Sequence, residues 1–219
     1  GHKVTVRHEE MVTDGDLNVK SRRTAKATLI YTCKEGEQEY SPRLTYMGFR
    51  YIGIEGIAPE NIEVSAIALY SDFEETGSFA CSDPLLNQLQ SNIRWSGKSN
   101  FVDIPTDCPQ RDERMGWTGD ISVFAKTACY NFDLAAFLDK WLYDVRAEQG
   151  HGGGLPLVVP KQGIAAPTVA TACWADCIVL VPWAESLARG DQELLRPMYP
   201  TMKMYLKAVR FLASLSGSG

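Results

Sequence analysis

Residues 105–120 hold an unusual density of side chains that can take part in acid–base chemistry. Within 14 residues there are four carboxylates, two guanidinium groups and an indole: Asp107, Asp112, Glu113, Asp120, Arg111, Arg114 and Trp117. Hydrolysis of a glycosidic bond needs such groups, because one carboxyl must keep a proton for the leaving oxygen, and like charges nearby raise a carboxyl pKa. Other carboxylates can accept hydrogen bonds from sugar hydroxyls, while an aromatic ring covers the apolar side of the sugar. The segment therefore predicts a carbohydrate site.

The same residues also have a purely structural interpretation. Arg111 and Arg114 can pair with Asp112 or Glu113 on a solvated loop, since ion-pair networks also cluster charges. Against this, two prolines and two glycines fix the backbone of a loop that otherwise has no reason to be rigid: Pro105, Pro109, Gly116 and Gly119. Composition alone leaves both interpretations open.

The segment IPTDCPQRDERMGWTGD, residues 104–120, resembles the signature of the α-L-rhamnosidases of glycoside hydrolase family 78. Shorter matches occur in the same order along the chain: YMGFRY at 46–51, FACSDP at 79–84, KWLYD at 140–144, WAD at 174–176 and PW at 182–183. The resemblance covers nearly the whole chain. It implies a β-sandwich followed by an (α/α)6 barrel, and inverting hydrolysis of terminal α-L-rhamnosides.

Roles for single residues follow from this resemblance. It implies that Glu113 is the general acid and that six further side chains bind the sugar: Asp107, Arg111, Asp112, Asp120, Trp117 and Trp174. Met115 stands where the family often has leucine, a change that conserves volume. The implied partner is a rhamnose-containing glycoside or polysaccharide.

The elements that must position these residues change character near residue 79. Up to residue 78 apolar residues alternate, which predicts an antiparallel β-sandwich over 1–78 with strands near Val4 and Val6, 25–31, 49–54 and 64–69. Asp14-Gly15 and Glu35-Gly36 are turn signals between them. We expect this sandwich to lack its first strands.

From residue 79 to 219 the period is that of a helix. Four helices are predicted. The first starts at Ser82-Asp83-Pro84 and has Leu86, Leu89 and Ile93 on one face, and the second runs from Asp133 to Val145. The third covers 171–188, bends near Pro182 and is stopped by Gly190, and the fourth lies around Met198 to Val209. Long loops are expected at 100–117 and 150–167, where long loops are often functional.

The helical part is short for a complete barrel. Twelve helices with loops need about 300 residues, so the prediction for 79–219 is a partial (α/α)6 six-hairpin toroid. An inverting enzyme also needs a general base. Asp176, Glu148 and Glu185 are weak candidates, and we expect the base outside this chain and the chain alone to be inactive. Apolar faces left open in a partial ring favour self-association into a homo-oligomer.

Composition and net charge narrow the kinds of partner and site that the chain can have. The chain has 219 residues, of which 45% are apolar, and a net charge of −5, which disfavours nucleic acid as a partner. No apolar run reaches the roughly 18 residues of a membrane span. The six cysteines contain no Cys-x-x-Cys pair, so we expect buried free thiols, no metal and no cofactor. The sequence does not determine the cellular compartment.

The main alternative to a rhamnosidase is a non-catalytic module that binds carbohydrate or a protein partner through the same loop. Another is a related six-hairpin glycosidase with a different sugar preference.

Overall fold

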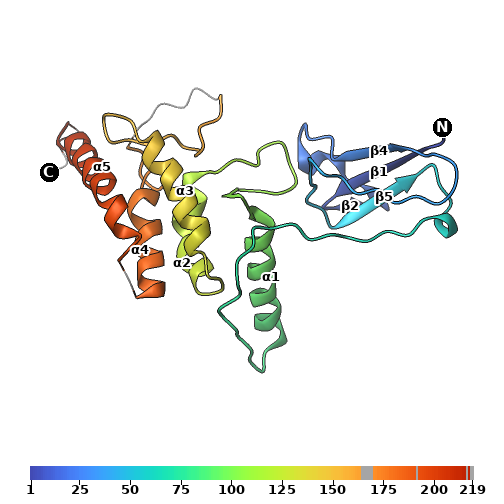
Figure 1. The fold of residues 1–219 in the computed structure, drawn as a ribbon, viewed down its shortest axis with the longest axis horizontal. Coiled ribbons are helices and arrows are strands. Elements are labelled where there is room, and N and C mark those ends of the chain that lie inside the picture. Colours follow the sequence, from blue (N-terminus) through green and yellow to red (C-terminus); the bar gives the residue numbers. More distant parts are fainter. Residues whose placement is uncertain (164–169, 191, 216, 218–219) are drawn as a thin grey trace. The chain divides into compact units, whose positions relative to one another are not determined.

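The computed structural model describes residues 1–163, 170–190, 192–215 and 217 (Figure 1). The chain divides into two compact units. The first, here the sheet unit, comprises Gly1–Leu69 together with Cys108–Arg114, and the second, the helical unit, comprises Tyr70–Asp107 and Met115–Gly219. The chemistry-bearing segment thus contributes residues to both. Among the described residues, none of the helices combines the length and apolar character that a membrane crossing requires.

The sheet unit is built around a three-stranded antiparallel sheet with β1 (Lys3–Glu9) at its centre. Strand β4 (Thr28–Thr32) pairs along one edge and β5 (Tyr51–Glu55) along the other, so that Val6 lies opposite both Leu29 and Ile54. A short ribbon of β2 (Val12–Thr13) and β3 (Asp16–Leu17) turns at Asp14 and Gly15, which both have positive φ. The alternation of the first part of the sequence is therefore that of antiparallel strands, as predicted.

Two strand predictions in this unit need correction. Residues 64–69 are not a strand, and Val64, Ile67 and Leu69 are each more than half exposed. Alternating apolar residues form a strand only where a neighbouring strand takes up their backbone hydrogen bonds. The predicted strand at 25–31 begins only at Thr28, because Ala27 has a φ of 42°, outside the extended region.

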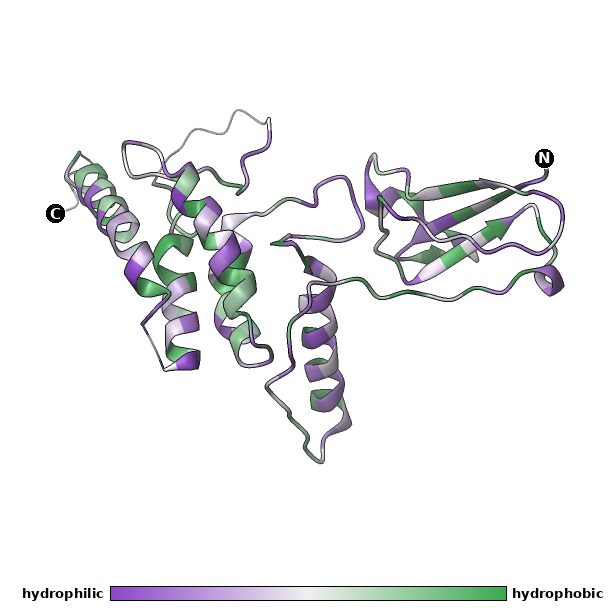
Figure 2. Cartoon of the chain, viewed as in Figure 1, coloured by the Kyte–Doolittle hydropathy of each residue, from purple (hydrophilic) through white to green (hydrophobic). Residues whose placement is uncertain are grey.

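The described residues of the helical unit form five α-helices and one tight hairpin. The helices are α1 (Pro84–Asn100), α2 (Thr118–Cys129), α3 (Ala135–Glu148), α4 (Cys177–Arg189) and α5 (Leu195–Leu215), and the hairpin joins β6 (Phe101–Val102) to β7 (Ile104–Pro105). Helix α4 packs against α2, α3 and α5. Apolar residues concentrate on these four helices, whereas α1 is largely hydrophilic (Figure 2).

The core forms where the helical spacing predicts it most clearly. On α3 the side chains of Leu138, Trp141, Leu142 and Val145 are fully or almost fully buried. The helix begins at Ala135, two residues after the predicted start at Asp133, and the Ala135 amide donates to the Asp133 carboxylate at 3.1 Å. The prediction of this helix is confirmed.

The other helix predictions are confirmed in part. Helix α1 starts as expected, with the Asp83 side chain accepting from Leu85 N at 2.8 Å, but Leu86 and Leu89 on its predicted core face are about half exposed. Helix α4 begins at Cys177 rather than at 171, because residues 172–176 form turns, and Gly190 ends it at a φ of 72°. Helix α2 was not predicted. The predicted loop at 150–167 falls in part on residues 164–169, outside the described residues.

Candidate active site

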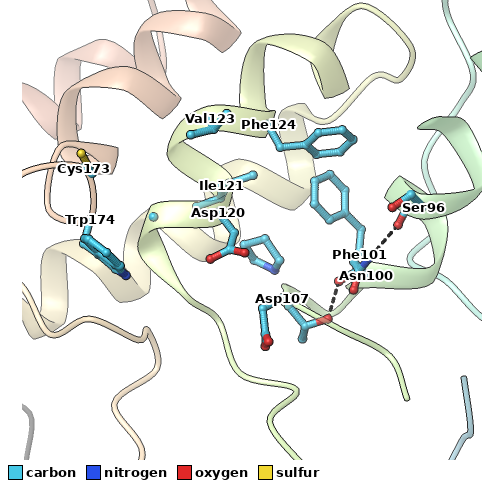
Figure 3. A pocket seen from close by; sticks show the side chains of 13 residues that line it. Ser96, Asn100, Phe101, Asp107, Asp120, Ile121, Val123, Phe124, Cys173 and Trp174 are labelled. Atoms are coloured by element: carbon cyan, nitrogen blue, oxygen red, sulfur yellow. Dashed lines mark hydrogen bonds between the residues drawn. The ribbon is translucent and has the colours of Figure 1, made fainter. Parts of the chain in front are cut away.

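The helical unit contains a cavity of about 540 Å³ that gathers three of the predicted sugar-binding residues. Asp107, Asp120 and Trp174 line it, and Figure 3 shows these three side chains around the same space. Other lining residues are Ser96, Asn100, Phe101, Phe124 and Cys173. Two carboxylates and an indole around a partly apolar cavity can hold a sugar by its hydroxyls and its apolar face.

Asp107 is positioned by the backbone of its own loop. Its amide donates to the Met115 carbonyl at 3.1 Å, and the Met115 amide donates to Asp107 Oδ1 at 3.0 Å. One residue earlier, Thr106 donates to the Asn100 carbonyl through both its amide, at 2.9 Å, and its hydroxyl, at 2.8 Å. The Asp107 carboxylate is therefore fixed before any ligand arrives.

Asp120 lies in the first turn of α2, where a negative charge is favoured by the helix dipole. The helix start is anchored by Thr118, whose hydroxyl donates to the Leu157 carbonyl at 3.0 Å. Gly116 supports the same junction, because a Cβ there would lie 2.1 Å from the Val159 carbonyl oxygen. The glycine is thus required by the close approach of two backbone segments rather than by a turn conformation.

Trp117 does not line the cavity. It precedes α2 and forms an isolated β-bridge with Val158. Its indole Nε1 is buried and has no hydrogen-bond partner among the described residues. A direct contact between Trp117 and a sugar thus stays a prediction.

The other predicted residues, Arg111, Asp112 and Glu113, belong to the sheet unit. Glu113 Oε2 lies 2.9 Å from Arg111 Nη2 and 2.9 Å from Arg23 Nη1, and the Glu113 side chain is 20% exposed. The pair between Arg111 and Glu113 is one that the purely structural interpretation of the loop predicts, whereas the pair with Arg23 was not predicted. Arg114 is also engaged, donating to the Tyr46 carbonyl at 2.9 Å with its guanidinium over the Tyr46 ring.

Asp112 is exposed but bonded. The hydroxyl and the amide of Thr24 both donate to its carboxylate. The hydroxyl bond is the main cause that lowers the Asp112 pKa from its ordinary value, with the Arg23 charge adding a small effect in the same direction.

Arg23 and Thr24 are residues that sequence reasoning missed. Thr24 and Asp112 are 88 positions apart, and no motif or periodicity connects them. The turn that carries them is unusual, since Arg23 has a φ of 57°. Asn100, Phe124 and Cys173 of the cavity were missed for the same reason: only the folded backbone brings them beside Asp107 and Asp120.

None of the three candidates for a general base lines the cavity. Glu148 accepts from the Lys161 amide at 2.8 Å through both oxygens. Asp176 accepts from the Tyr205 hydroxyl at 2.6 Å and from the Cys173 amide at 2.7 Å.

Glu185 is 2% exposed and accepts from the Cys129 thiol at 3.4 Å. Burial, helped by the Glu185 charge, raises the pKa of Cys129 to about 12. This carboxylate is thus committed to the α2–α4 contact.

The six cysteines are free thiols, but only Cys108, Cys129 and Cys177 are buried. Cys81 and Cys173 are exposed, and Cys33 is half-buried. The expectation that the thiols are buried therefore holds for half of them.

Comparison with known proteins places both units in one group. Residues 1–70 match the model of the bacterial α-L-rhamnosidase concanavalin-like domain, and residues 74–212 match that of the bacterial α-L-rhamnosidase six-hairpin glycosidase domain. An α-L-rhamnosidase of Formosa agariphila is 41% identical over 212 residues, 94% of this chain and 23% of the relative. One of Streptomyces avermitilis is 41% identical over 211 residues, 94% of this chain and 20% of the relative.

Solved structures agree. The native α-L-rhamnosidase from Aspergillus terreus superposes with a TM-score of 0.87 at 42% identity, covering 94% of this chain and 24% of that chain. The Streptomyces avermitilis α-L-rhamnosidase complexed with L-rhamnose gives 0.88 at 39% identity, covering 94% of this chain and 20% of that chain. A concanavalin-like sheet domain followed by a six-hairpin helical domain is thus the fold class, as predicted. The chain spans about a fifth to a quarter of the length of these relatives.

Proposed function

Because this chain belongs to the bacterial α-L-rhamnosidase family, we propose that it is part of a glycoside hydrolase that releases terminal α-L-rhamnose from a glycoside or polysaccharide. The observation that carries the proposal is the cavity in which Asp107, Asp120 and Trp174 meet. The carboxylates accept hydrogen bonds from the sugar hydroxyls, and the indole covers an apolar face of the ring. A related structure, that of Streptomyces avermitilis, contains L-rhamnose.

In this proposal Glu113 is the general acid of an inverting reaction. It gives its proton to the glycosidic oxygen while water attacks the anomeric carbon from the opposite face. The contacts of Glu113 with Arg23 and Arg111 hold its carboxyl in place. A carboxyl that donates a proton must first carry one, so in this proposal both ion pairs of Glu113, with Arg23 and with Arg111, give way when substrate binds.

The general base is proposed to come from outside this chain. Inversion places base and acid carboxyls roughly 6.5–9.5 Å apart, with the attacking water between them. Asp176, Glu148 and Glu185 are each engaged elsewhere in the helical unit and none lines the cavity. A base supplied by another part of a longer protein is consistent with the fraction of the relatives that this chain spans.

One observation favours the alternative of a carbohydrate-binding module. Glu113 is paired with Arg111 as well as Arg23, which suits a carboxylate that only positions its neighbours. Such a module would bind rhamnose through the cavity without cleaving a bond.

The test is hydrolysis of an aryl α-L-rhamnoside by the 219-residue chain, by its Glu113→Gln variant and by Glu193→Gln, a control at a highly exposed carboxylate. The proposal predicts no turnover by the chain alone, together with L-rhamnose binding that Asp107→Asn weakens. Turnover that is lost in Glu113→Gln and kept in Glu193→Gln would establish the acid but contradict the external base. A chain that neither cleaves the rhamnoside nor binds rhamnose contradicts the assignment of the cavity.

A further inference from the structure

Trp174, the aromatic wall of the cavity, is carried by a turn rather than by a helix or strand. Residues 172–176 form this turn directly before α4, and Cys173 within it has a φ of 71°, which is costly for a residue with a side chain. The turn is also exposed at Cys173 and Trp174. A side chain on an exposed, strained turn stays in one place only if other groups hold it.

The first holding contact comes from α5. The Tyr205 hydroxyl donates to Asp176 Oδ1 at 2.6 Å, and the Cys173 amide donates to Asp176 Oδ2 at 2.7 Å. Asp176 therefore connects the strained residue of the turn to a buried tyrosine, which is 2% exposed. Burial, together with the bond to Asp176, raises the pKa of Tyr205, so its hydroxyl remains a donor at any physiological pH.

The second holding contact comes from α2. A Cβ on Gly119 would lie 3.1 Å from Trp174 Nε1, so the indole rests directly against the first turn of this helix. The Ser122 hydroxyl approaches the Trp174 carbonyl at 3.5 Å. Asp120 lies on the same turn of α2 and on the same cavity. The Trp174 ring therefore packs against α2, while α5 holds the turn that carries the ring.

We propose that Asp176 and Tyr205 are positioning residues that preorganise Trp174, so that α5 controls how tightly the cavity holds its sugar without contacting it. Neither residue lines the cavity, and both act through the turn. The effect on affinity rests on the proposed function, since it requires Trp174 to contact rhamnose. Losing this preorganisation should weaken binding by roughly two- to tenfold, the order expected for having to immobilise one large side chain on binding.

The test is Tyr205→Phe, which removes one hydroxyl and keeps the ring. Tyr199→Phe is the matched control, because Tyr199 lies on the same helix and is 59% exposed. Two quantities are measured in the 219-residue chain: the Kd for L-rhamnose and the rate of alkylation of Cys173, which reports the turn without any sugar. We expect Tyr205→Phe to raise both several-fold and Tyr199→Phe to change neither.

A double-mutant cycle with Trp174→Ala separates positioning from general destabilisation. If Tyr205 acts through the indole, Tyr205→Phe raises the Kd in the parent chain but not in the Trp174→Ala background. An equal rise in both backgrounds, or a Tyr205→Phe variant with unchanged Kd and unchanged Cys173 rate, would overturn the inference. Asp176→Asn should reproduce the effect of Tyr205→Phe.

Failure of the proposed function looks different. In that case the parent chain does not bind L-rhamnose, or Trp174→Ala binds it as tightly as the parent. The Cys173 rates then decide the positioning claim alone: faster alkylation in Tyr205→Phe but not in Tyr199→Phe supports it, and equal rates reject it.

Discussion

The carboxylates of the signature segment differ in what holds them. Asp107 is held by a backbone amide of its own loop, Asp112 by Thr24, and Glu113 by two guanidinium groups. Asp107 thus keeps its place through a contact within its own loop, whereas Asp112 and, through Arg23, Glu113 depend on residues far earlier in the chain. A change at residues 23–24 should therefore be felt at Asp112 and Glu113 and not at Asp107.

The Thr24 hydroxyl provides the first prediction at this scale. Thr24→Val removes the main cause of the lowered Asp112 pKa, so that pKa should rise, which a carboxyl NMR titration measures. A lowered folded-state pKa contributes stability above the ordinary value of 3.8, and this contribution is lost as pH falls through the folded value. The stability difference between parent and variant should therefore shrink in acid. The control is Thr32→Val, at an exposed strand position, whose stability difference from the parent should not change with pH. A stability difference for Thr24→Val that also stays constant with pH would contradict the hydrogen bond between Thr24 and Asp112.

The reactivity of the cysteine thiols provides the second prediction at this scale. Burial raises the pKa of Cys129 to about 12, so at a pH of about 8 only about one molecule in ten thousand carries the thiolate. Cys173 is exposed at the cavity. Brief treatment of the folded chain with iodoacetamide, followed by mass spectrometry of its peptides, should find Cys173 modified and Cys129 intact. Comparable labelling of the two would contradict the buried contact of Cys129 with Glu185.

At the residue scale, the sequence could predict the site only where the residues are contiguous. The density of carboxylates in 105–120, and its resemblance to a family signature, pointed to Asp107 and Asp120, which share the cavity with Trp174. Arg23, Thr24 and Tyr205 could not be predicted in the same way. Each reaches its partner through the tertiary fold, and arginine, threonine and tyrosine at such positions are ordinary residues.

The start of α2 is the element on which the cavity depends most. It places Asp120, supports the Trp174 ring and is anchored at Thr118. Its sequence explains why periodicity did not reveal it, since Gly119 in its first turn is a poor helix former and belongs to the signature rather than to an apolar stripe. Helix α3 is the opposite case, because its buried stripe runs without interruption from Leu138 to Val145.

Gly116→Ala tests this helix start. The added methyl group would meet the Val159 carbonyl at 2.1 Å, a backbone atom that cannot move without shifting its segment. We expect a loss of about 1–3 kcal/mol in the free energy of unfolding, the cost of inserting an atom into packed structure, measured by urea denaturation. Gly152→Ala is the control, because nothing lies within 4 Å of its added methyl group. Equal stability of the two variants would mean that the close approach at Gly116 is not present in solution.

At the scale of the whole molecule, the change of period near residue 79 and the family resemblance together were sufficient for the fold class. Neither of them predicts which apolar helix faces are covered by another element. Large apolar side chains remain exposed on α1 and α5, including Leu85 at 79% and Phe211 at 63%. Spacing along a helix shows that a stripe exists, but not whether another element lies against it.

These exposed faces predict self-association of the chain. Sedimentation velocity over a range of concentrations should show a rising weight-average mass, and Phe211→Ser together with Leu215→Ser should reduce it, since both side chains are exposed near the end of α5. Lys207→Ser on the same helix serves as the control for the loss of a long side chain. A monodisperse monomer at all concentrations would contradict the prediction.

The central claim is that the cavity lined by Asp107, Asp120 and Trp174 receives rhamnose. The most direct test is protection of Cys173, which lines the same cavity, against alkylation by increasing concentrations of L-rhamnose. The account predicts that the sugar slows modification of Cys173 but not of the exposed Cys81, and that Asp120→Asn requires more sugar for the same protection. Cys173 modification that is unaffected by saturating L-rhamnose would contradict it.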